Sequence, residues 1–303
     1  MAMVKSKAKG SRIFNFCNIL FFALIMIVCI LPVWHVLCAS FSNASWVMNQ
    51  RGLIWYIKDF TLNGYQLVFN DNSIWTGYLN TFIYVIGTTV LGMFLTVMAA
   101  YALSRKDFIW ANPLMLIISF TMLFSGGIVT LYILVTQTLN MYDSRWALIL
   151  PNCMSAFYLI LVRTAMQNVP DSLEESAMLD GAGRFTILFQ IMLPLIKATL
   201  ATVILYYVIG NWNSWFNAMI YIRSEDKKPL QLILKELLVD TNSSSNANVD
   251  IRVLASGESG DAVLYKQLMK YCTIMVSTVP MFIFYPFIQK YFESGVMIGA
   301  IKG

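Results

Sequence analysis

Residues 72–104 read NSIWTGYLNTFIYVIGTTVLGMFLTVMAAYALS and contain no Asp, Glu, Lys or Arg. A helix needs about twenty mostly apolar residues to cross a bilayer. Charges inside the hydrocarbon are costly, so they mark where such helices end. This stretch therefore predicts a transmembrane helix. The same criterion, a long run without charged residues, identifies further candidate spans in the rest of the chain.

Five further intervals also lack charged residues, and with the first they are 13–50, 72–104, 108–142, 146–162, 198–222 and 271–289. Arg163 can extend its long side chain to the membrane surface and lengthen the fourth interval. We expect an all-α integral membrane protein with six transmembrane helices near 14–38, 78–103, 112–136, 146–167, 198–221 and 271–290. The apolar interval 185–196 is too short to cross, and we expect an interfacial helix stopped by Pro194.

The composition supports a membrane protein. Of 303 residues, 58% are hydrophobic and only 12% are charged, against about a quarter charged in a typical soluble domain. Disordered, fibrous and disulfide-scaffold classes are excluded on the same grounds. The five cysteines show no zinc-type spacing, and we expect the single histidine, His35, to be structural.

The distribution of charge predicts the orientation. With the N-terminus inside, the inner segments carry eleven cations and six acids, and the outer segments carry ten of each. The positive-inside rule then places both termini in the cytoplasm of a multi-pass cell-membrane protein. The net charge of +5 therefore requires no nucleic-acid partner.

This orientation defines the expected domain limits. Residues 1–12 form the cytoplasmic N-terminus, 13–292 the transmembrane domain and 293–303 a cytoplasmic tail. The outer loop 39–77 is rich in Trp and Tyr, which fits either an interfacial aromatic belt or a docking surface for a soluble partner. In the outer loop 222–270, the polar run 241–246 predicts a flexible tip and Leu230–Val239 a short helix.

The cytoplasmic loop 168–197 has an ordered pattern, VPDSLEESAMLDGAGR over 169–184. Ser172 and Glu175 have capping-box spacing, and Gly181 fits the left-handed position after a helix. We expect a helix, a glycine turn and a second helix, with an exposed apolar tip at 177–179. This unit is either a membrane-surface hairpin or a helix that fits a groove on a cytoplasmic protein.

The same loop resembles the EAA signature of ABC importer permeases. The matching residues are Glu175-Ser176-Ala177, Gly181 and Ile191-Met192-Leu193-Pro194, and Ser176 stands where the signature has alanine. Six spans with this loop between the fourth and fifth are similar to the second permease of maltose-type carbohydrate importers. The longer outer loop after span five resembles permeases of the alginate and pectin-oligosaccharide group. The end of the tail resembles that subunit's Gly-rich, Lys-Gly ending.

The resemblance implies a coupling helix and a set of partners. The partners are a second permease, a different chain, two ATP-binding-cassette ATPases and an extracytoplasmic solute-binding protein, together with membrane lipid. The implied ATPase-coupling residues, including three inferred groove contacts, are Glu175, Ala177, Met178, Leu179, Asp180, Gly181, Leu193 and Pro194. The tail residues implied at the ATPase interface are Gly299, Lys302 and Gly303.

The chain itself shows no catalytic machinery. Gly87 and Gly92 have phosphate-loop spacing, but Met93 and Phe94 follow where Lys and Ser or Thr are required. We therefore expect no catalytic residue, no metal site and no cofactor bound by this chain. ATP and Mg belong to the partner ATPases.

Polar residues in the outer half of span five suggest a substrate path. Asn211, Asn213, Trp215 and Asn217 are costly against lipid, whereas amides can bind sugar hydroxyls and an indole can stack on a sugar face. Asn80 and Tyr84 in span two form a second, weaker set. Each of these asparagines could instead bond neighbouring helices to one another.

The sequence thus predicts a bacterial permease subunit of an ABC importer that translocates oligosaccharides delivered by an external binding protein. An importer of another small solute, such as an amino acid, carries the same coupling loop and remains the alternative. A non-transport membrane scaffold would leave the loop pattern without an explanation.

Overall fold

The computed structural model describes residues 9–124, 126–244 and 268–286. In these ranges the regular elements are all helices. The chain divides into two compact units, Met1–Asp71 with Leu237–Thr278 and Asn72–Glu236 with Val279–Gly303. The tail residues implied at the ATPase interface, Gly299, Lys302 and Gly303, lie outside the described residues.

Three described helices are long and apolar enough to cross a membrane alone: Ile13–Ser40, Asn72–Ser104 and Leu268–Pro286. Two bent pairs pass the same test, Ala111–Leu123 with Gly127–Thr138 and Arg184–Leu195 with Lys197–Trp212. The described chain therefore has three such spans, or up to five if each pair is one span. The structure supports a helical membrane protein, and the count of six stays a prediction.

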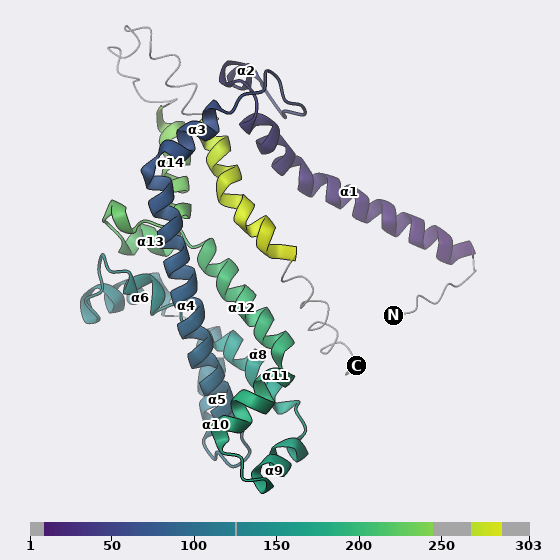
Figure 1. Ribbon diagram of the computed structural model, residues 1–303, viewed down its shortest axis with the longest axis vertical. Helices are drawn as coiled ribbons and strands as arrows, with labels where there is room; N and C mark the ends of the chain where they lie inside the picture. Colours follow the sequence, from purple (N-terminus) through teal and green to yellow (C-terminus); the bar gives the residue numbers. More distant parts are fainter. Residues whose placement is uncertain (1–8, 125, 245–267, 287–303) are drawn as a thin grey trace. The chain divides into compact units, whose positions relative to one another are not determined.

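The second unit is organised around α4 (Asn72–Ser104), against which α8 (Ala156–Gln167) and α12 (Lys197–Trp212) pack (Figure 1). At Gly92, α4 lies close to α12 and to the segment before α8. A Cβ atom there would lie 2.5 Å from the Cys153 carbonyl oxygen and 2.7 Å from the Tyr207 ring. Only glycine allows this approach. The Tyr207 hydroxyl donates to the same carbonyl at 3.0 Å and lies 3.1 Å from Thr96 Oγ1.

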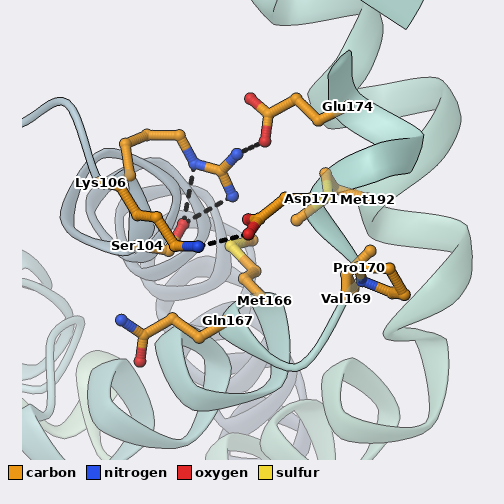
Figure 2. A pocket seen from close by; sticks show the side chains of 10 residues that line it. Ser104, Lys106, Met166, Gln167, Val169, Pro170, Asp171, Glu174 and Met192 are labelled. Atoms are coloured by element: carbon orange, nitrogen blue, oxygen red, sulfur yellow. Dashed lines mark hydrogen bonds and ion pairs between the residues drawn. The ribbon is translucent and has the colours of Figure 1, made fainter. Parts of the chain in front are cut away.

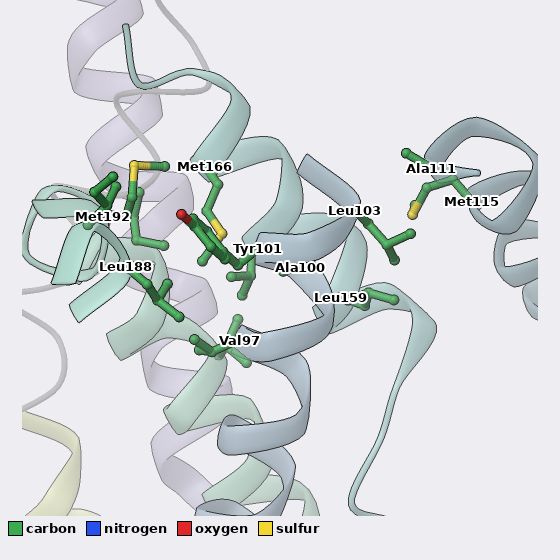
Figure 3. Close-up of a cluster of buried hydrophobic side chains, with 14 of the residues drawn as sticks. Val97, Ala100, Tyr101, Leu103, Ala111, Met115, Leu159, Met166, Leu188 and Met192 are labelled. Carbon is green, nitrogen blue, oxygen red and sulfur yellow. The ribbon is translucent and has the colours of Figure 1, made fainter. Parts of the chain in front are cut away.

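An apolar cluster between Gly92 and the lower end of α4 holds these helices together (Figure 3). It joins α4 to α5 (Ala111–Leu123), to α8 and to the helix after residue 184. Its large fully buried side chains include Leu159, Met166, Leu188 and Met192. Burying a side chain of this size contributes about 1.5–3 kcal/mol.

The predicted single helix over 146–167 is interrupted in the structure. It consists of α7 (Trp146–Ile149) and α8, with Leu150–Ser155 not helical. Pro151 causes the break, because it has no N–H for the carbonyl one turn earlier and its ring crowds that carbonyl. The Asn152 side chain and the Cys153 N–H satisfy carbonyls at 2.9 and 3.3 Å instead.

The predicted helix over 198–221 is also interrupted. It consists of α12 and α13 (Phe216–Tyr221), separated by residues 213–215. Asn211 and Asn213 donate their side-chain amides to the carbonyls of Tyr207 and Ile209, at 2.8 and 3.0 Å. Such bonds compete with the backbone ladder and favour a helix end.

The remaining elements of this unit are short. They are α6 (Gly127–Ile133), the π-helix η1 (Leu134–Thr138), the 3-10 helix η3 (Glu225–Lys227) and the start of α14 (Leu230–Ser244). The helix expected at Leu230–Val239 is therefore confirmed and extends further.

The first unit contains α1 (Lys9–Ser40), α2 (Ala44–Asn49), α3 (Asn63–Asn70) and part of the helix Leu268–Pro286. Most of α1 is exposed and apolar, as expected for a lipid-facing helix. His35 Nδ1 accepts the Ile54 N–H at 2.9 Å, and its ring meets Tyr271 edge to face. These contacts agree with the structural role expected for this histidine.

Candidate functional site

The loop with the ordered pattern folds as a compact elbow, which we define as residues 170–195. Its first helix is α9 (Asp171–Leu179), which begins after Pro170. The predicted capping box is wrong, because no side chain caps this helix and Ser172 lies inside its first turn. Asp171 and Glu174 occupy that turn, where acids are stabilised by the helix dipole.

Gly181 ends α9 as the sequence predicts. Its φ is +83°, a conformation that strains residues with a Cβ atom. The Ala182 N–H donates to the Ala177 carbonyl at 2.9 Å, and the Gly181 N–H donates to Met178 at 3.0 Å. This pair of bonds is a Schellman motif, and it fixes the angle at which the chain leaves α9.

The second helix of the elbow is built from α10 (Arg184–Thr186), the π-helix η2 (Ile187–Met192) and α11 (Leu193–Leu195). The helix does not stop at Pro194 as expected but continues to Leu195, since the wide π-turn before the proline leaves room for its ring. The chain then turns by 83° into α12. That angle fits the interfacial helix expected for 185–196.

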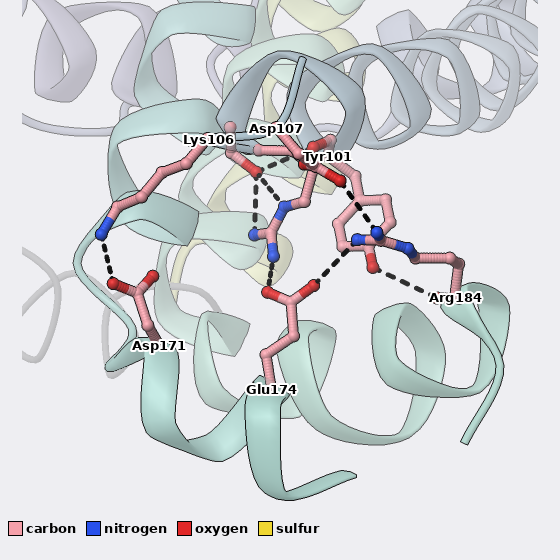
Figure 4. Close-up of polar contacts among 8 residues, drawn as sticks. Tyr101, Lys106, Asp107, Asp171, Glu174 and Arg184 are labelled. Atoms are coloured by element: carbon pink, nitrogen blue, oxygen red, sulfur yellow. Dashed lines mark hydrogen bonds and ion pairs between the residues drawn. The ribbon is translucent and has the colours of Figure 1, made fainter. Parts of the chain in front are cut away.

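A cluster of charged side chains ties α9 to the end of α4 (Figure 4). Glu174 forms an ion pair with Arg105, and only 12% and 14% of these side chains are exposed. Arg184 approaches the same carboxylate at 3.4 Å and Asp107 at 2.9 Å. Burial lowers the pKa of Arg105, but a guanidinium stays protonated at physiological pH.

Lys106 and Asp171 form a second pair at the edge of this cluster. Here 83% and 59% of the side chains are exposed, so water competes for both charges. The hydrogen bond to Asp171 raises the pKa of Lys106. The two pairs therefore join the same two segments. The pair of Glu174 with Arg105 is shielded from water, and the pair of Lys106 with Asp171 is open to it.

A cavity of about 90 Å³ lies beside these pairs (Figure 2). Its lining includes Arg105, Lys106, Met166, Pro170 and Met192. Side chains do not fill the space between the start of α9 and the end of α4. The ion pairs span this gap.

The predicted coupling residues lie in three environments. Those on the outside of the elbow are Glu175, Met178, Leu179, Asp180, Gly181 and Pro194, and Leu179 is 89% exposed. Ala177 and Leu193 are half-buried and pack against the apolar cluster. The docking role of these residues stays a prediction.

Glu174 is not among the site residues predicted from the sequence. Glu174 lies three residues before Ala177, hence on the same helix face, and Ala177 packs inward. A short basic loop, Arg105-Lys106, was available to pair with it. Those two signals together could have identified it as an inward-facing acid.

At the other end of α4 lies a second polar assembly, which we call the clamp: Asn80, Thr81 and Tyr84 with the segments 143–145 and 221–230. Asn80 is 1% exposed, and its amide donates to the carbonyls of Asp226 and Lys228 at 2.7 and 3.1 Å. Arg145 donates to its carbonyl oxygen at 3.1 Å. The amide is thus fully engaged by the protein.

Two neighbouring side chains of α4 complete this contact. Thr81 Oγ1 accepts the Leu230 N–H at 2.9 Å, and the Tyr84 hydroxyl donates to the Lys227 carbonyl at 2.7 Å. The structure therefore shows Asn80 and Tyr84 as ties to the segment before α14. Their part in a substrate path stays a prediction.

Asp143 holds the same segment from the other side. Its backbone has φ +56°, and its carboxylate accepts the Ser224 hydroxyl and the N–H groups of Arg223 and Ser224, the latter two at 3.0 Å. The Ser224 bonds, followed by the Arg223 bond, hold the pKa of this carboxyl well below its usual range. Lys227 Nζ adds a bond of 2.7 Å to the Asp143 carbonyl.

The span-five candidates lie where α12 ends. Asn211 and Asn213 bond to carbonyls of their own helix, and Asn217 lies half-buried in α13. Trp215 is 39% exposed, with the Lys235 ammonium 5.8 Å from its ring centre. The structure brings Trp215 and Lys235 together, a pairing that the sequence does not predict.

Comparisons with known proteins agree on the class of molecule. Residues 92–218 match the family model "Binding-protein-dependent transport system inner membrane component". The polygalacturonan/rhamnogalacturonan transport system permease protein YtcP of Bacillus subtilis (strain 168) is 38% identical, over 97% of this chain and 99% of its own. The arabinooligosaccharides transport system permease protein AraQ of the same strain is 27% identical over 94% of each chain.

A solved structure is similar over nearly the whole chain. It is the crystal structure of a bacterial ABC transporter involved in the import of the acidic polysaccharide alginate. The match has a TM-score of 0.84 and 30% sequence identity, and it covers 95% of this chain and 100% of that one.

Proposed function

Because this chain belongs to the family of binding-protein-dependent transport system inner membrane components, we propose that it is the permease subunit of an ABC importer for oligosaccharides. The names of the relatives support this substrate class: one transports polygalacturonan and rhamnogalacturonan, and another arabinooligosaccharides. The structurally similar transporter imports alginate.

The proposed complex contains a second permease, two ATPases that bind ATP and Mg, and an extracytoplasmic binding protein. The elbow faces the cytoplasm and α9 docks in a groove of an ATPase subunit. The observation that carries this assignment is the exposed tip at Leu179, 89% exposed on a helix whose exit angle is fixed by Gly181. An apolar side chain held out in this way suits a helix-in-groove contact.

ATP binding then closes the ATPases, and the elbow passes that movement to the membrane helices as rigid-body gating. Glu175, Met178, Leu179 and Asp180 would contact the groove. Gly181 sets the angle between the two elbow helices.

Trp215 is the span-five residue best placed to meet a sugar. Its exposed indole can stack on a sugar face, and the nearby Lys235 ammonium suits the carboxylate of an acidic sugar. Trp215→Ala should reduce uptake while the complex still assembles. Trp146→Ala removes another exposed indole, in α7, and is the matched control. Equal loss of assembly and uptake in Trp215→Ala would indicate a structural role instead.

Reconstitution tests the proposal as a whole. The permease pair, the ATPases and the binding protein are placed in vesicles and offered oligogalacturonates, alginate oligomers, arabinooligosaccharides, maltodextrins and amino acids. We expect ATP-dependent uptake of one oligosaccharide class. Uptake of amino acids alone would support the alternative solute class. Failure of any ATPase to copurify would support a scaffold.

A further inference from the structure

On the assumption that the proposed function is correct, we propose that Glu174 is a positioning residue that carries the movement of α9 to α4. Its carboxylate, with the guanidinium groups of Arg105 and Arg184, forms a unit that we call the brace (Figure 4). The brace connects the elbow to the one helix that also bears the clamp.

Glu174 and Glu175 are adjacent in sequence but face different surroundings. Successive residues of an α-helix point about 100° apart. Glu174 is shielded against Arg105, whereas Glu175 is exposed. The inward acid therefore serves a contact within this chain, and the outward acid remains available to a partner.

The brace is itself held in place. Arg105 Nε and Nη2 donate to Ser104 Oγ at 3.2 and 3.0 Å, and its guanidinium lies 4.7 Å from the centre of the Tyr101 ring. The Tyr101 hydroxyl donates to the Arg184 carbonyl at 3.3 Å. A charged group with fixed donors on both sides resists displacement in either direction.

Packing alone connects α9 weakly to its surroundings. None of its nine residues is fully buried, and a helix of that length is marginal without tertiary contacts. The cavity beside the brace separates part of the start of α9 from the end of α4, and the other charged contact there, Lys106 with Asp171, is open to water. The shielded Glu174 carboxylate is therefore the strongest contact through which a displacement of α9 reaches the end of α4.

A double-mutant cycle in the assembled, reconstituted importer tests this inference. Glu174→Gln, Arg105→Gln and the double variant are compared for ATPase copurification, ATP hydrolysis and oligosaccharide imported per ATP. We expect each single variant to retain its ATPases. The amount of oligosaccharide imported per ATP hydrolysed should fall at least about fivefold. The double variant should be no worse than either single one, since the two residues act together.

Two more variants complete the design. Arg105→Lys keeps the charge but loses the forked donor, and we expect an intermediate loss. Lys106→Gln removes the exposed partner of Asp171 from the same loop, and we expect import per ATP to equal that of the wild type. This control shows whether the effect needs the shielded pair or only the charge of the loop.

Three results would overturn the inference. They are an unchanged import per ATP in Glu174→Gln, strictly additive losses in the double variant, and loss of ATPase binding in Glu174→Gln, which would make Glu174 a docking residue. A wild-type complex that neither binds ATPases nor imports sugar would instead refute the proposed function.

Discussion

The two ends of α4 hold neighbouring segments by different chemistry. At the clamp, buried neutral side chains of α4 bond to backbone groups of residues 226–230. At the elbow, charged side chains bond to one another, and Arg184 and Lys106 are more than half exposed. A buried amide that loses its partners cannot regain water, whereas an ion pair at a membrane surface can. The difference indicates a fixed clamp and an elbow whose exposed pair, Lys106 with Asp171, can open while the shielded pair, Glu174 with Arg105, stays closed.

The largest expected effect comes from removing the centre of the clamp. Asn80→Leu leaves the part-buried carbonyls of Asp226 and Lys228 without the Asn80 donor, and an unsatisfied buried polar group costs about 1–3 kcal/mol at most. We expect a lower melting temperature of the purified complex and faster proteolysis after Arg223. Thr76→Ala, which removes one local bond on the same helix, is the control. Equal stability of the two variants would contradict a fixed clamp.

A smaller effect is expected at the glycine turn of the elbow. Gly181→Val places a β-branched residue at φ +83°, with strain of about 1–2 kcal/mol. We expect α9 to change its angle and substrate-stimulated ATP hydrolysis and uptake to fall.

Gly183→Ala is the matched control for this substitution. Gly183 has φ −72° and open space around a Cβ atom, so alanine fits there without strain. If both variants transport like the wild type, the angle of the elbow does not matter for coupling.

The smallest expected effect is the loosening of the clamp at low pH. The folded-state pKa of Asp143 lies below its ordinary value of 3.8. The stabilisation of the folded state by its carboxylate is therefore complete above pH 3.8. It is lost as the pH falls toward the folded-state pKa. We expect the segment 223–228 to become more accessible to hydrogen exchange below about pH 4. Asp143→Asn should weaken this dependence, and an identical pH profile in wild type and variant would exclude Asp143 as the cause.

Local signals in the sequence predicted much of the elbow and of the long helices. The charge-free runs located α1 and α4, and Gly181 predicted the left-handed turn. The interruptions at 150–155 and 213–215 were also readable, since Pro151 and the paired amides at 211 and 213 disfavour a continuous helix. Continuous helices were nevertheless predicted there, because the prediction followed the length of the apolar runs rather than these local signals.

The long-range contacts could not be predicted in this way. Asn80 binds carbonyls 146 and 148 residues further along the chain, and no periodicity within one helix identifies such partners. The brace joins residue 105 to residues 174 and 184, which are also far along the chain, so its partners could not be predicted either. Hydropathy identifies which side chains avoid water, whereas the fold decides which polar groups meet.

The close approach at Gly92 has a mechanical consequence for α4. This helix continues without interruption from Asn72 to Ser104, and Gly92 lies midway between Asn80 and Ser104. Each arm is about 18 Å long at 1.5 Å per residue. With no side chain at position 92, the backbone of α4 lies directly against Cys153 and Tyr207. Any larger residue at position 92 would push α4 away from both neighbours and so displace the two ends that carry the clamp and the brace.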